Sequence, residues 1–515
     1  MSNPSPPETS QDSVYVTGFM LWPTVIVLAL SNFMAVLDMT IVNVAVPHIA
    51  GSLAVSPNEG TWVITSYAVA EAITVPLTGW LAARFGALRM FLLSAFGFGL
   101  MSMMCGVAPS LTSLVLFRIL QGLAGGPLMP MSQTLIMRIA PPEKRSMGLG
   151  LWTMTTIIAP IAGPLIGGTI ADSIGWPWAF FINVPIAIFI VVAASFLLAG
   201  RETPTVRRPI DYIGLSLLVI WVGSLQMVLD NGQNKDWFGS TEIVVLTVIA
   251  AIGFAAFLIW ELTDAHPIVD LRVFRHRGFA AASVAMTLNF GAFFATVVLI
   301  PLWLQSNLNY TASWAGYVTS FNGVLGIFMA PVVGILMNYI DPRKLITFGL
   351  CIVSATVLVR VYFNTDLALW QLILPQLVQG IGMPFFFVPL IGMAMSFVRP
   401  EETASAAGLI NFERSMAAAF GTAIVTSTWS DAIITSHSDL SGILHNTTGT
   451  LTLLQRLGMS PPQALDALDG MVQSQAIMLA TIHVFFLAGI CMLVAAASVW
   501  LAPKPSGPVR AGPSH

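Results

Sequence analysis

The sequence predicts an all-α polytopic membrane protein, and three observations point to this class. Of the 515 residues, 56% are hydrophobic and only 9% are charged, whereas charged residues make up about 25% of a soluble globular chain. The apolar residues form runs long enough for membrane helices, which need about 20 residues each. These runs lack the alternation that strands of a membrane barrel show over about 10 residues.

Fourteen runs satisfy the length of a membrane helix, and mostly short polar segments separate them. The helices are expected near residues 22–47, 61–83, 88–108, 112–138, 147–171, 178–200, 212–231, 242–262, 279–303, 313–337, 344–363, 369–397, 405–431 and 479–501.

The basic residues favour one orientation of these helices. Sixteen of the 21 Lys and Arg residues fall in the loops and C-terminal tail on one side, two fall on the opposite side and three lie within spans. Because cytosolic loops are enriched in Lys and Arg, both termini are expected in the cytosol. The first 20 residues contain no Lys or Arg, so they lack the basic start of a signal peptide and are expected to form a disordered tail.

Two stretches of the first half recur in the second half. "RILQGLAGGPLMP" (118–130) recurs as "QLVQGIGMPFFFVP" (376–389), and "APPEKRSMGLGL" (140–151) recurs as "VRPEETASAAGL" (398–409), both at an offset of 258 residues. The chain is therefore expected to consist of two six-helix bundles with two inserted helices between them. The expected division is a tail at 1–20, a first bundle at 21–200, an insert with linkers at 201–275, a second bundle at 276–501 with an outer loop at 432–478, and a tail at 502–515.

Two parallel six-helix halves are the architecture of the major facilitator superfamily. "LDMTIVNVAVP" (37–47), "RILQG" (118–122) and "APIAGPLIGG" (159–168) resemble the motifs of its fourteen-span drug:proton antiporters in helices one, four and five. Over nearly its whole length the chain resembles the EmrB-type multidrug efflux pumps. The resemblance implies proton-coupled export of hydrophobic or amphipathic drugs and toxic compounds across a bacterial inner membrane.

Two other functions stay open at this point. One is the export or import of a single dedicated metabolite by the same fold, and the other is a membrane sensor that transports nothing. An ATP-driven pump is not indicated, because the sequence has no G-x-x-x-x-G-K-[ST] motif. We expect a secondary transporter rather than an enzyme, with no cofactor, metal site or nucleic-acid partner, because no catalytic grouping is evident and the three cysteines are far apart.

Five ionisable residues lie deep within predicted spans, where a charge costs about 2.5–3.5 kcal/mol unless it is paired or hydrated. They are Asp38, Glu71, Arg118, Glu413 and Arg414. At 1.5 Å per helical residue, Asp38 and Glu71 both lie about 15 Å below the outer surface, and Arg118 lies about 9 Å below it. An Arg–carboxylate cluster is therefore expected in the first bundle. Arg360 lies nearer the outer end of its span and is expected to extend its head group to the interface.

The resemblance makes Asp38 the proton-coupling acid and Arg118 its partner. Burial opposes the charged carboxylate and a nearby arginine favours it, so a moving helix can load and release a proton. A static structural ion pair is the alternative. Glu71 and Glu413 are further candidates for coupling, although Glu413 and Arg414 alternatively form a local pair. The residues expected at the substrate cavity are Tyr67, Gln121, Asn43, Trp152, Gln379 and Arg414.

Small residues are expected to control conformational change. In helix five they are Gly163, Pro164, Gly167 and Gly168, which lack bulk or a backbone donor and let a neighbouring helix approach. In the cytosolic loop after helix two they are Gly79 and Gly86, together with Arg84. This loop departs from the family motif because Ala83 stands where an acidic residue is usual.

The long outer segment is expected to contain an amphipathic helix that starts at Ser460-Pro461-Pro462 and lies on the outer face. The resemblance implies that outer surfaces help to dock a periplasmic membrane-fusion adaptor (EmrA-like), which continues to an outer-membrane channel (TolC-like). Drugs, protons and membrane lipid are the other expected partners.

Overall fold

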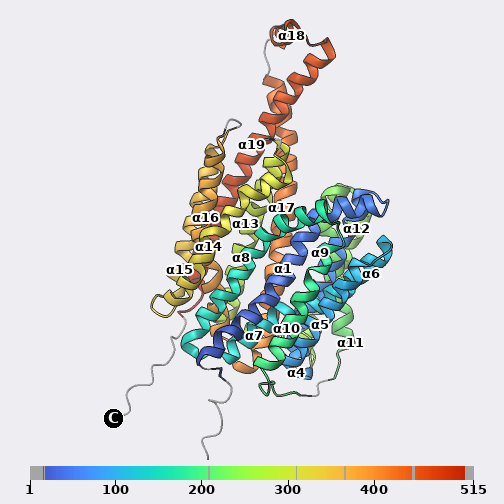
Figure 1. Ribbon diagram of the computed structural model, residues 1–515. Coiled ribbons are helices and arrows are strands. Elements are labelled where there is room, and N and C mark those ends of the chain that lie inside the picture. The colour runs from blue at the N-terminus through green and yellow to red at the C-terminus, as the bar shows by residue number, and fades with distance from the viewer. Residues whose placement is uncertain are drawn as a thin grey trace, which may run out of the picture.

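The computed structural model describes residues 15–16, 18–206, 209–308, 310–364, 367–443 and 447–504, and all regular structure in these residues is helical (Figure 1). Most of the two tails expected at 1–20 and 502–515 lies outside the described residues. The helices run roughly alongside one another in two bundles, with a projection at one end (Figure 1).

Residues of the first half form six helical passages, three of which are made of two or more pieces. The second passage breaks around Pro76 and the fourth around Pro127, because proline lacks the N–H that a continuous helix needs. The elements are α1 (Leu21–Ser52), α2 (Pro57–Gly60), α3 (Trp62–Thr74), η2 (Val75–Leu77), α4 (Thr78–Phe85), α5 (Ala87–Gly106), α6 (Leu111–Gly125), α7 (Leu128–Ile139), α8 (Pro142–Ser173), α9 (Trp178–Phe181) and α10 (Asn183–Leu197).

The insert and the second half follow the predicted order. The insert is α11 (Tyr212–Asn231) and α12 (Thr241–Thr263), of which α11 packs against α12 and α3. The second half comprises α13 (Arg277–Ser306), α14 (Ala312–Leu336), α15 (Pro342–Val359), η6 (Arg360–Tyr362), α16 (Leu369–Ser396), α17 (Thr403–Ile443), α18 (Thr447–Arg456) and α19 (Pro461–Ser498).

Eleven helices in the described part of the chain are long and apolar enough to cross a membrane. Three of the fourteen predicted spans are not in this set: the segmented passage from α3 to α4, and the helices α8 and α17. The passage from α3 to α4 and helix α17 carry charged and polar residues within their apolar stretches, whereas α8 includes side chains outside the described part and is not tested. The prediction of fourteen spans therefore stays a prediction.

The prediction of an amphipathic helix lying on the outer face is wrong. A helix does begin at Pro461 as predicted, with Ser460 at its N-cap, but it continues for 38 residues through the last span. Helix α17 likewise runs for 41 residues instead of ending near 431. No proline interrupts residues 403–443, so the helix continues outward. Together α17 and α19 form a projection beyond the bundles, with α18 at its tip (Figure 1).

The two halves touch on the side that carries the basic loops. Helix α8 packs against α14, and α17 packs against α4 and α7. A Cβ atom placed on Gly408 of α17 would lie 2.9 Å from the carbonyl oxygen of Val75. A Cβ atom placed on Gly334 of α14 would lie 2.9 Å from the carbonyl oxygen of Ser146 in α8. The backbones of the halves are therefore in close contact near these helix ends.

Candidate functional site

The Asp38 carboxylate lies at the centre of a buried polar network in the first bundle. Arg118 Nη1 of α6 donates to Asp38 Oδ2 at 2.6 Å, and both side chains are almost fully buried. Gln121 Nε2 donates to Oδ1 at 3.1 Å, and Asn183 Nδ2 of α10 donates to Oδ1 at 2.7 Å. The carboxylate thus receives donors on both oxygens from two neighbouring helices. The ion pair predicted between Asp38 and Arg118 is present.

Further contacts fix the Arg118 guanidinium. Its Nε donates to the Val63 carbonyl oxygen at 3.0 Å, and its Nη1 also donates to Gln121 Oε1 at 2.9 Å. The Tyr67 ring lies below the guanidinium, with 4.1 Å between the guanidinium carbon and the ring centroid. Removing one partner of such a buried pair leaves the other charge uncompensated, which lowers the stability of the fold by about 3–5 kcal/mol.

Asn183 is the residue of this network that sequence reasoning missed. It follows α9 at the first position of α10, is fully buried, and also donates to Ser102 Oγ of α5 at 3.1 Å. The available signal was an amide in "FFINVP" (180–185), within an otherwise apolar run. Its place in the network only emerges once α5 and α10 pack against α1.

Asn183→Leu is expected to lower transport at least about fivefold and to destabilise the protein by about 1.5–3 kcal/mol, because a hydrogen bond to a charged group is lost. Transport in proteoliposomes and thermal unfolding would be measured. Ser195→Ala is the control. Ser195 is an exposed residue of the same helix, and its hydroxyl donates to the Val191 carbonyl oxygen within that helix. Equal values for the two variants would contradict a role for Asn183 in holding Asp38.

Glu71 does not form an ion pair with Arg118, although the Arg–carboxylate cluster predicted for the first bundle included it. It is 8% exposed in α3, and within the described residues it has no cationic nitrogen within 4 Å. The guanidinium groups of Arg414 in α17 and of Arg118 both act on its charge from a distance.

The adjacent residues Glu413 and Arg414 point to different halves. Arg414 lies against the first half, where its Nη2 is 2.9 Å from the Met129 sulfur and its guanidinium is 6.0 Å from the Trp152 ring centroid. Glu413 lies beside Ser283 of α13, within the second half. Successive residues on a helix point about 100° apart. The structure thus does not contain the local Glu413–Arg414 pair, and the coupling role of Glu413 stays a prediction.

The residues predicted at the cavity are distributed over several places. Tyr67 and Gln121 belong to the Asp38 network. Trp152 is fully buried and its indole donates to Ser132 Oγ at 2.8 Å, while Gln379 accepts from Arg360 in the second bundle. Asn43 is exposed on α1. The structure thus places these residues at several positions, and their role in substrate binding stays a prediction.

The expectation that Arg360 extends to the interface is wrong. Its side chain is 1% exposed, and it lies in the second bundle against Phe485 of α19. The 3-10 turn η6, which begins at Arg360, follows α15 and directs this residue among its neighbouring helices.

The helix-five glycines lie against α1 beside Asp38. A Cβ atom on Gly163 would collide with the Thr40 side chain and lie 3.2 Å from its backbone carbonyl carbon, and one on Gly167 would lie 3.1 Å from Ile41 Cα. One on Gly168 would meet Val44 only at 3.9 Å. The backbone of Pro164 belongs to α8, while its side chain lies outside the described part. Gly163 and Gly167 thus permit the approach of α8 to the aspartate-bearing helix.

The side chain of Glu202, which follows α10, binds the loop between α4 and α5. In this loop Ala83 stands where the family motif has an acidic residue. Glu202 Oε1 and Oε2 accept from the backbone N–H groups of Leu88 and Arg89 at 3.0 and 2.9 Å, at the start of α5. Gly86 has a φ of +91°, and a Cβ there would collide with this carboxylate. Carboxylates stabilise helix N-termini, so Glu202 supplies a negative charge that the motif position Ala83 cannot.

The other two loop residues lie nearby. Gly79 faces Ser405 of α17 so closely that a Cβ would collide with it, and Arg84 stacks on the Trp80 ring at 5.3 Å. Gly79 therefore lies where the two halves meet.

Glu202→Ala is expected to destabilise the protein by about 0.5–2 kcal/mol, as does the loss of a helix cap. The measurement is thermal unfolding in detergent. Glu242→Ala removes a half-exposed carboxylate that pairs with Lys235, and such surface pairs contribute about 0–1 kcal/mol. If the two variants unfold at the same temperature, Glu202 does not hold the loop.

Comparison with known proteins agrees with this geometry. Residues 28–422 match the Major Facilitator Superfamily. The chain is 42% identical over 487 residues to the multidrug export protein EmrB of Escherichia coli strain K12, covering 94% of this chain and 95% of that protein. It is 41% identical over 493 residues to the fatty acid resistance protein FarB of Neisseria gonorrhoeae, covering 94% and 96%. The proton:xylose symporter XylE shares the fold, with a TM-score of 0.59 at 13% identity, covering 95% of this chain and 97% of that one.

Proposed function

Because the chain belongs to the major facilitator superfamily and is a homologue of EmrB-type multidrug exporters, we propose that it is a proton-coupled antiporter that exports hydrophobic and amphipathic compounds. It is a multi-pass membrane protein and a secondary transporter rather than an enzyme. The exported compounds would leave across a bacterial inner membrane, with both termini in the cytosol and the proton gradient as the energy source.

The observation that carries this proposal is the buried Asp38–Arg118 pair, which receives two further amide donors. When Asp38 binds a proton, it loses the charge that attracts Arg118. The contact between α1 and α6 then weakens, and α1 becomes free to shift. When the proton leaves, the pair forms again. Binding or release of one proton at Asp38 thereby changes how α1 packs against α6.

Helix α8 offers a route from this pair to the rest of the molecule. It packs on α1 through Gly163 and Gly167, and on the second half through α14. A shift of α1 therefore displaces α8 relative to α14, where the halves touch. This connects proton binding at Asp38 to the contact between the halves.

The test is drug uptake into inside-out proteoliposomes, driven by an imposed pH gradient. The native protein is expected to accumulate several unrelated amphipathic dyes, and a protonophore is expected to stop this accumulation. Accumulation of one compound alone would favour the exporter of a dedicated metabolite. Binding of dyes without any flux would favour the sensor.

The projection formed by α17, α18 and α19 is the proposed docking element for a periplasmic adaptor (EmrA-like), which would continue to an outer-membrane channel (TolC-like). It is the part of the second half that extends beyond the bundles (Figure 1). Replacing residues 440–462 by a short flexible loop is expected to abolish co-purification of the adaptor while leaving flux in proteoliposomes intact. Unchanged co-purification would remove this role.

A further inference from the structure

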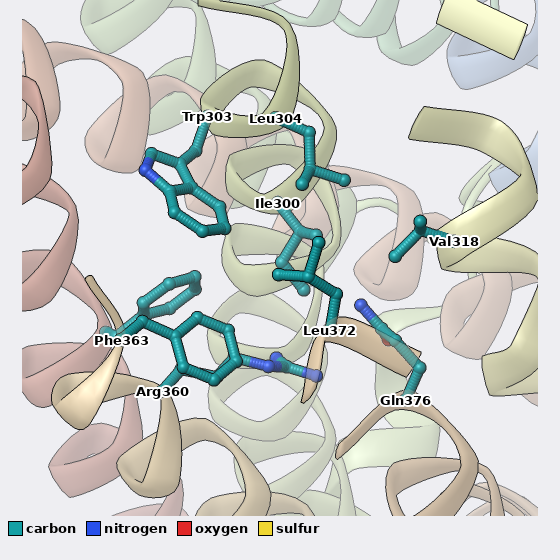
Figure 2. Close-up of a pocket in the computed structure, with 9 residues that line it drawn as sticks. Ile300, Trp303, Leu304, Val318, Arg360, Phe363, Leu372 and Gln376 are labelled. Carbon is teal, nitrogen blue, oxygen red and sulfur yellow. The ribbon is translucent and has the colours of Figure 1, made fainter. Parts of the chain in front are cut away.

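Arg360 and Glu261 are fully buried ionisable side chains that have no oppositely charged group within 4 Å among the described residues. Arg360 lies beside Leu372 and Gln376 (Figure 2), where the packed side chains leave about 10 Å³, room for one water molecule. An arginine keeps its charge in a protein, whereas a carboxyl group becomes neutral when it binds a proton. Glu261 can therefore lose the charge that burial opposes.

Glu261 lies in the last turn of the inserted helix α12, within the sequence WELTD (260–264). Its Oε2 accepts from the Val269 backbone N–H at 3.2 Å, so it holds the linker that follows α12. Its Oε1 is buried and has no hydrogen-bond partner in the described part of the chain. One oxygen of this carboxyl group is thus satisfied and the other is not.

The unsatisfied oxygen of Glu261 lies next to a second carboxyl group, that of Asp211 at the start of α11. A Cβ atom placed on Gly214 would collide with Asp211 Oδ2 and lie 2.5 Å from Glu261 Oε1. Both oxygens therefore converge on one point beside the Gly214 backbone. Two ionised carboxylates repel each other strongly when they are this close and one of them is buried.

The surroundings of the two acids differ. Asp211 is the N-cap of α11, where its Oδ1 accepts from the Gly214 N–H at 2.8 Å. The Trp260 indole donates to both of its carboxylate oxygens at 3.0 Å. Negative charge is favoured at a helix N-terminus and disfavoured near a C-terminus. Of the two acids, Glu261 near the C-terminus of α12 is therefore the one that takes up a proton.

We propose that Glu261 carries a proton on Oε1 at neutral pH and forms with Asp211 a second proton-binding site, separate from Asp38. The proton removes the repulsion between the two carboxyl groups and makes Oε1 a donor that faces Asp211 Oδ2. The pair then joins α11, α12 and the linker that leads to α13. When the proton is lost, the repulsion returns and the hold on the linker weakens.

An open groove connects this pair to the surface. Its volume is about 300 Å³, and the residues that line it include Asp211, Asp264 and His266. Asp264 adds a negative charge near Glu261, and His266 is exposed. The groove is the route by which the proton exchanges with solvent.

The basic residues of the 3-10 turn η5 (Leu271–Arg275) in the linker bind other groups. The Arg272 guanidinium donates to the Asp264 backbone oxygen at 2.8 Å, and its N–H donates to Asp270 at 3.2 Å. Arg275 pairs with Glu402 at 2.5 Å. Within the described residues neither arginine forms an ion pair with Glu261 or Asp211. A proton is therefore the cation that neutralises the pair.

The test compares the full-length native protein with Glu261→Gln by thermal unfolding in detergent, between about pH 6 and about pH 9. Glutamine reproduces the protonated acid, because its NH₂ group stands where the Oε1–H group would be and its oxygen still accepts from Val269. The variant is expected to be at least as stable as the native protein, and its advantage is expected to grow as the pH rises. In this range the folded native protein binds one proton more than its unfolded chain, so the ratio of the two unfolding constants changes by up to about tenfold per pH unit.

Glu242→Gln is the matched control. Glu242 is a half-exposed acid at the other end of the same helix, where it pairs with Lys235 at 2.6 Å. Its difference in stability from the native protein is expected to be the same at both ends of the pH range. The site lies on the insert and does not depend on the proposed proton-coupled export, so the two can fail separately.

Infrared spectroscopy detects the proton directly. The difference spectrum of the native protein and Glu261→Gln is expected to show the C=O band of a protonated carboxyl group at neutral pH, and this band is expected to vanish at alkaline pH. Absence of the band, or an advantage of Glu261→Gln that does not grow with pH, would overturn the proposal. Failure of Glu261→Gln to fold would do the same, because glutamine keeps the shape of the protonated acid. Stability that follows the concentration of Na⁺ or K⁺ instead of pH would assign the pair to a metal cation.

Discussion

Asp38→Asn is expected to reduce pH-gradient-driven drug flux in proteoliposomes to the level of empty vesicles, while drug binding changes by less than about threefold. Asparagine keeps the size of the side chain but cannot carry the charge that holds Arg118 at 2.6 Å. The protein would then stay in the state that a proton normally induces. Because Arg118 loses its ionic partner, thermal stability is also expected to fall, by up to about 3–5 kcal/mol.

Glu71→Gln and Glu413→Gln are the matched variants. Each neutralises an acid that forms no ion pair with Arg118 among the described residues, so each is expected to retain gradient-driven flux, at a lower rate. If Asp38→Asn still pumps against a gradient, Asp38 is structural. Whichever of the other two variants then fails would identify the coupling acid.

Gly163→Ala is expected to lower flux at least about tenfold, because one added methyl group collides with Thr40, two residues after Asp38. Overpacking of this kind costs about 1–3 kcal/mol, which corresponds to about 5- to 150-fold in an equilibrium between conformations. The measurement is drug flux together with the proton leak in the absence of drug, since a separated α1–α8 contact is expected to raise the leak.

Gly168→Ala adds the same methyl group five residues further along α8, where the nearest atom is Val44 Cγ1 at 3.9 Å. Its flux and leak should equal those of the native protein. Similar losses in both variants would mean that helix propensity, rather than the α1 contact, explains the effect of alanine at position 163.

The fold was predictable because each helix can be recognised from its own stretch of sequence. Long apolar runs predict helices whatever their neighbours, and the recurrence of "QG" and "PE" segments at a constant offset predicts two similar halves. The all-helical major facilitator fold is confirmed. The outer segment was predicted wrongly because polarity indicates exposure, and an exposed helix can lie on a surface or extend from it, as α17 and α19 do.

The site was predictable only in part. Depth along a helix placed Asp38 and Arg118 at compatible levels, and they do pair. The depth of a residue in the membrane does not tell on which side of its helix the side chain lies. The prediction that Glu71 joins the Asp38–Arg118 ion pair was therefore wrong. Asn183 and Glu202 were missed because their partners lie on helices that are remote in the sequence. Arg360 was misjudged because its position near a helix end suggested exposure, whereas η6 directs it inward.

The most direct test of the central claim measures protons rather than drug. Drug is added to the purified protein in weakly buffered solution, and a pH-sensitive dye reports protons released into the medium. We expect the native protein to release protons in proportion to drug bound, and Asp38→Asn to bind drug while releasing none. Equal proton release by Asp38→Asn and the native protein would contradict the assignment of Asp38 as the group that exchanges its proton for drug.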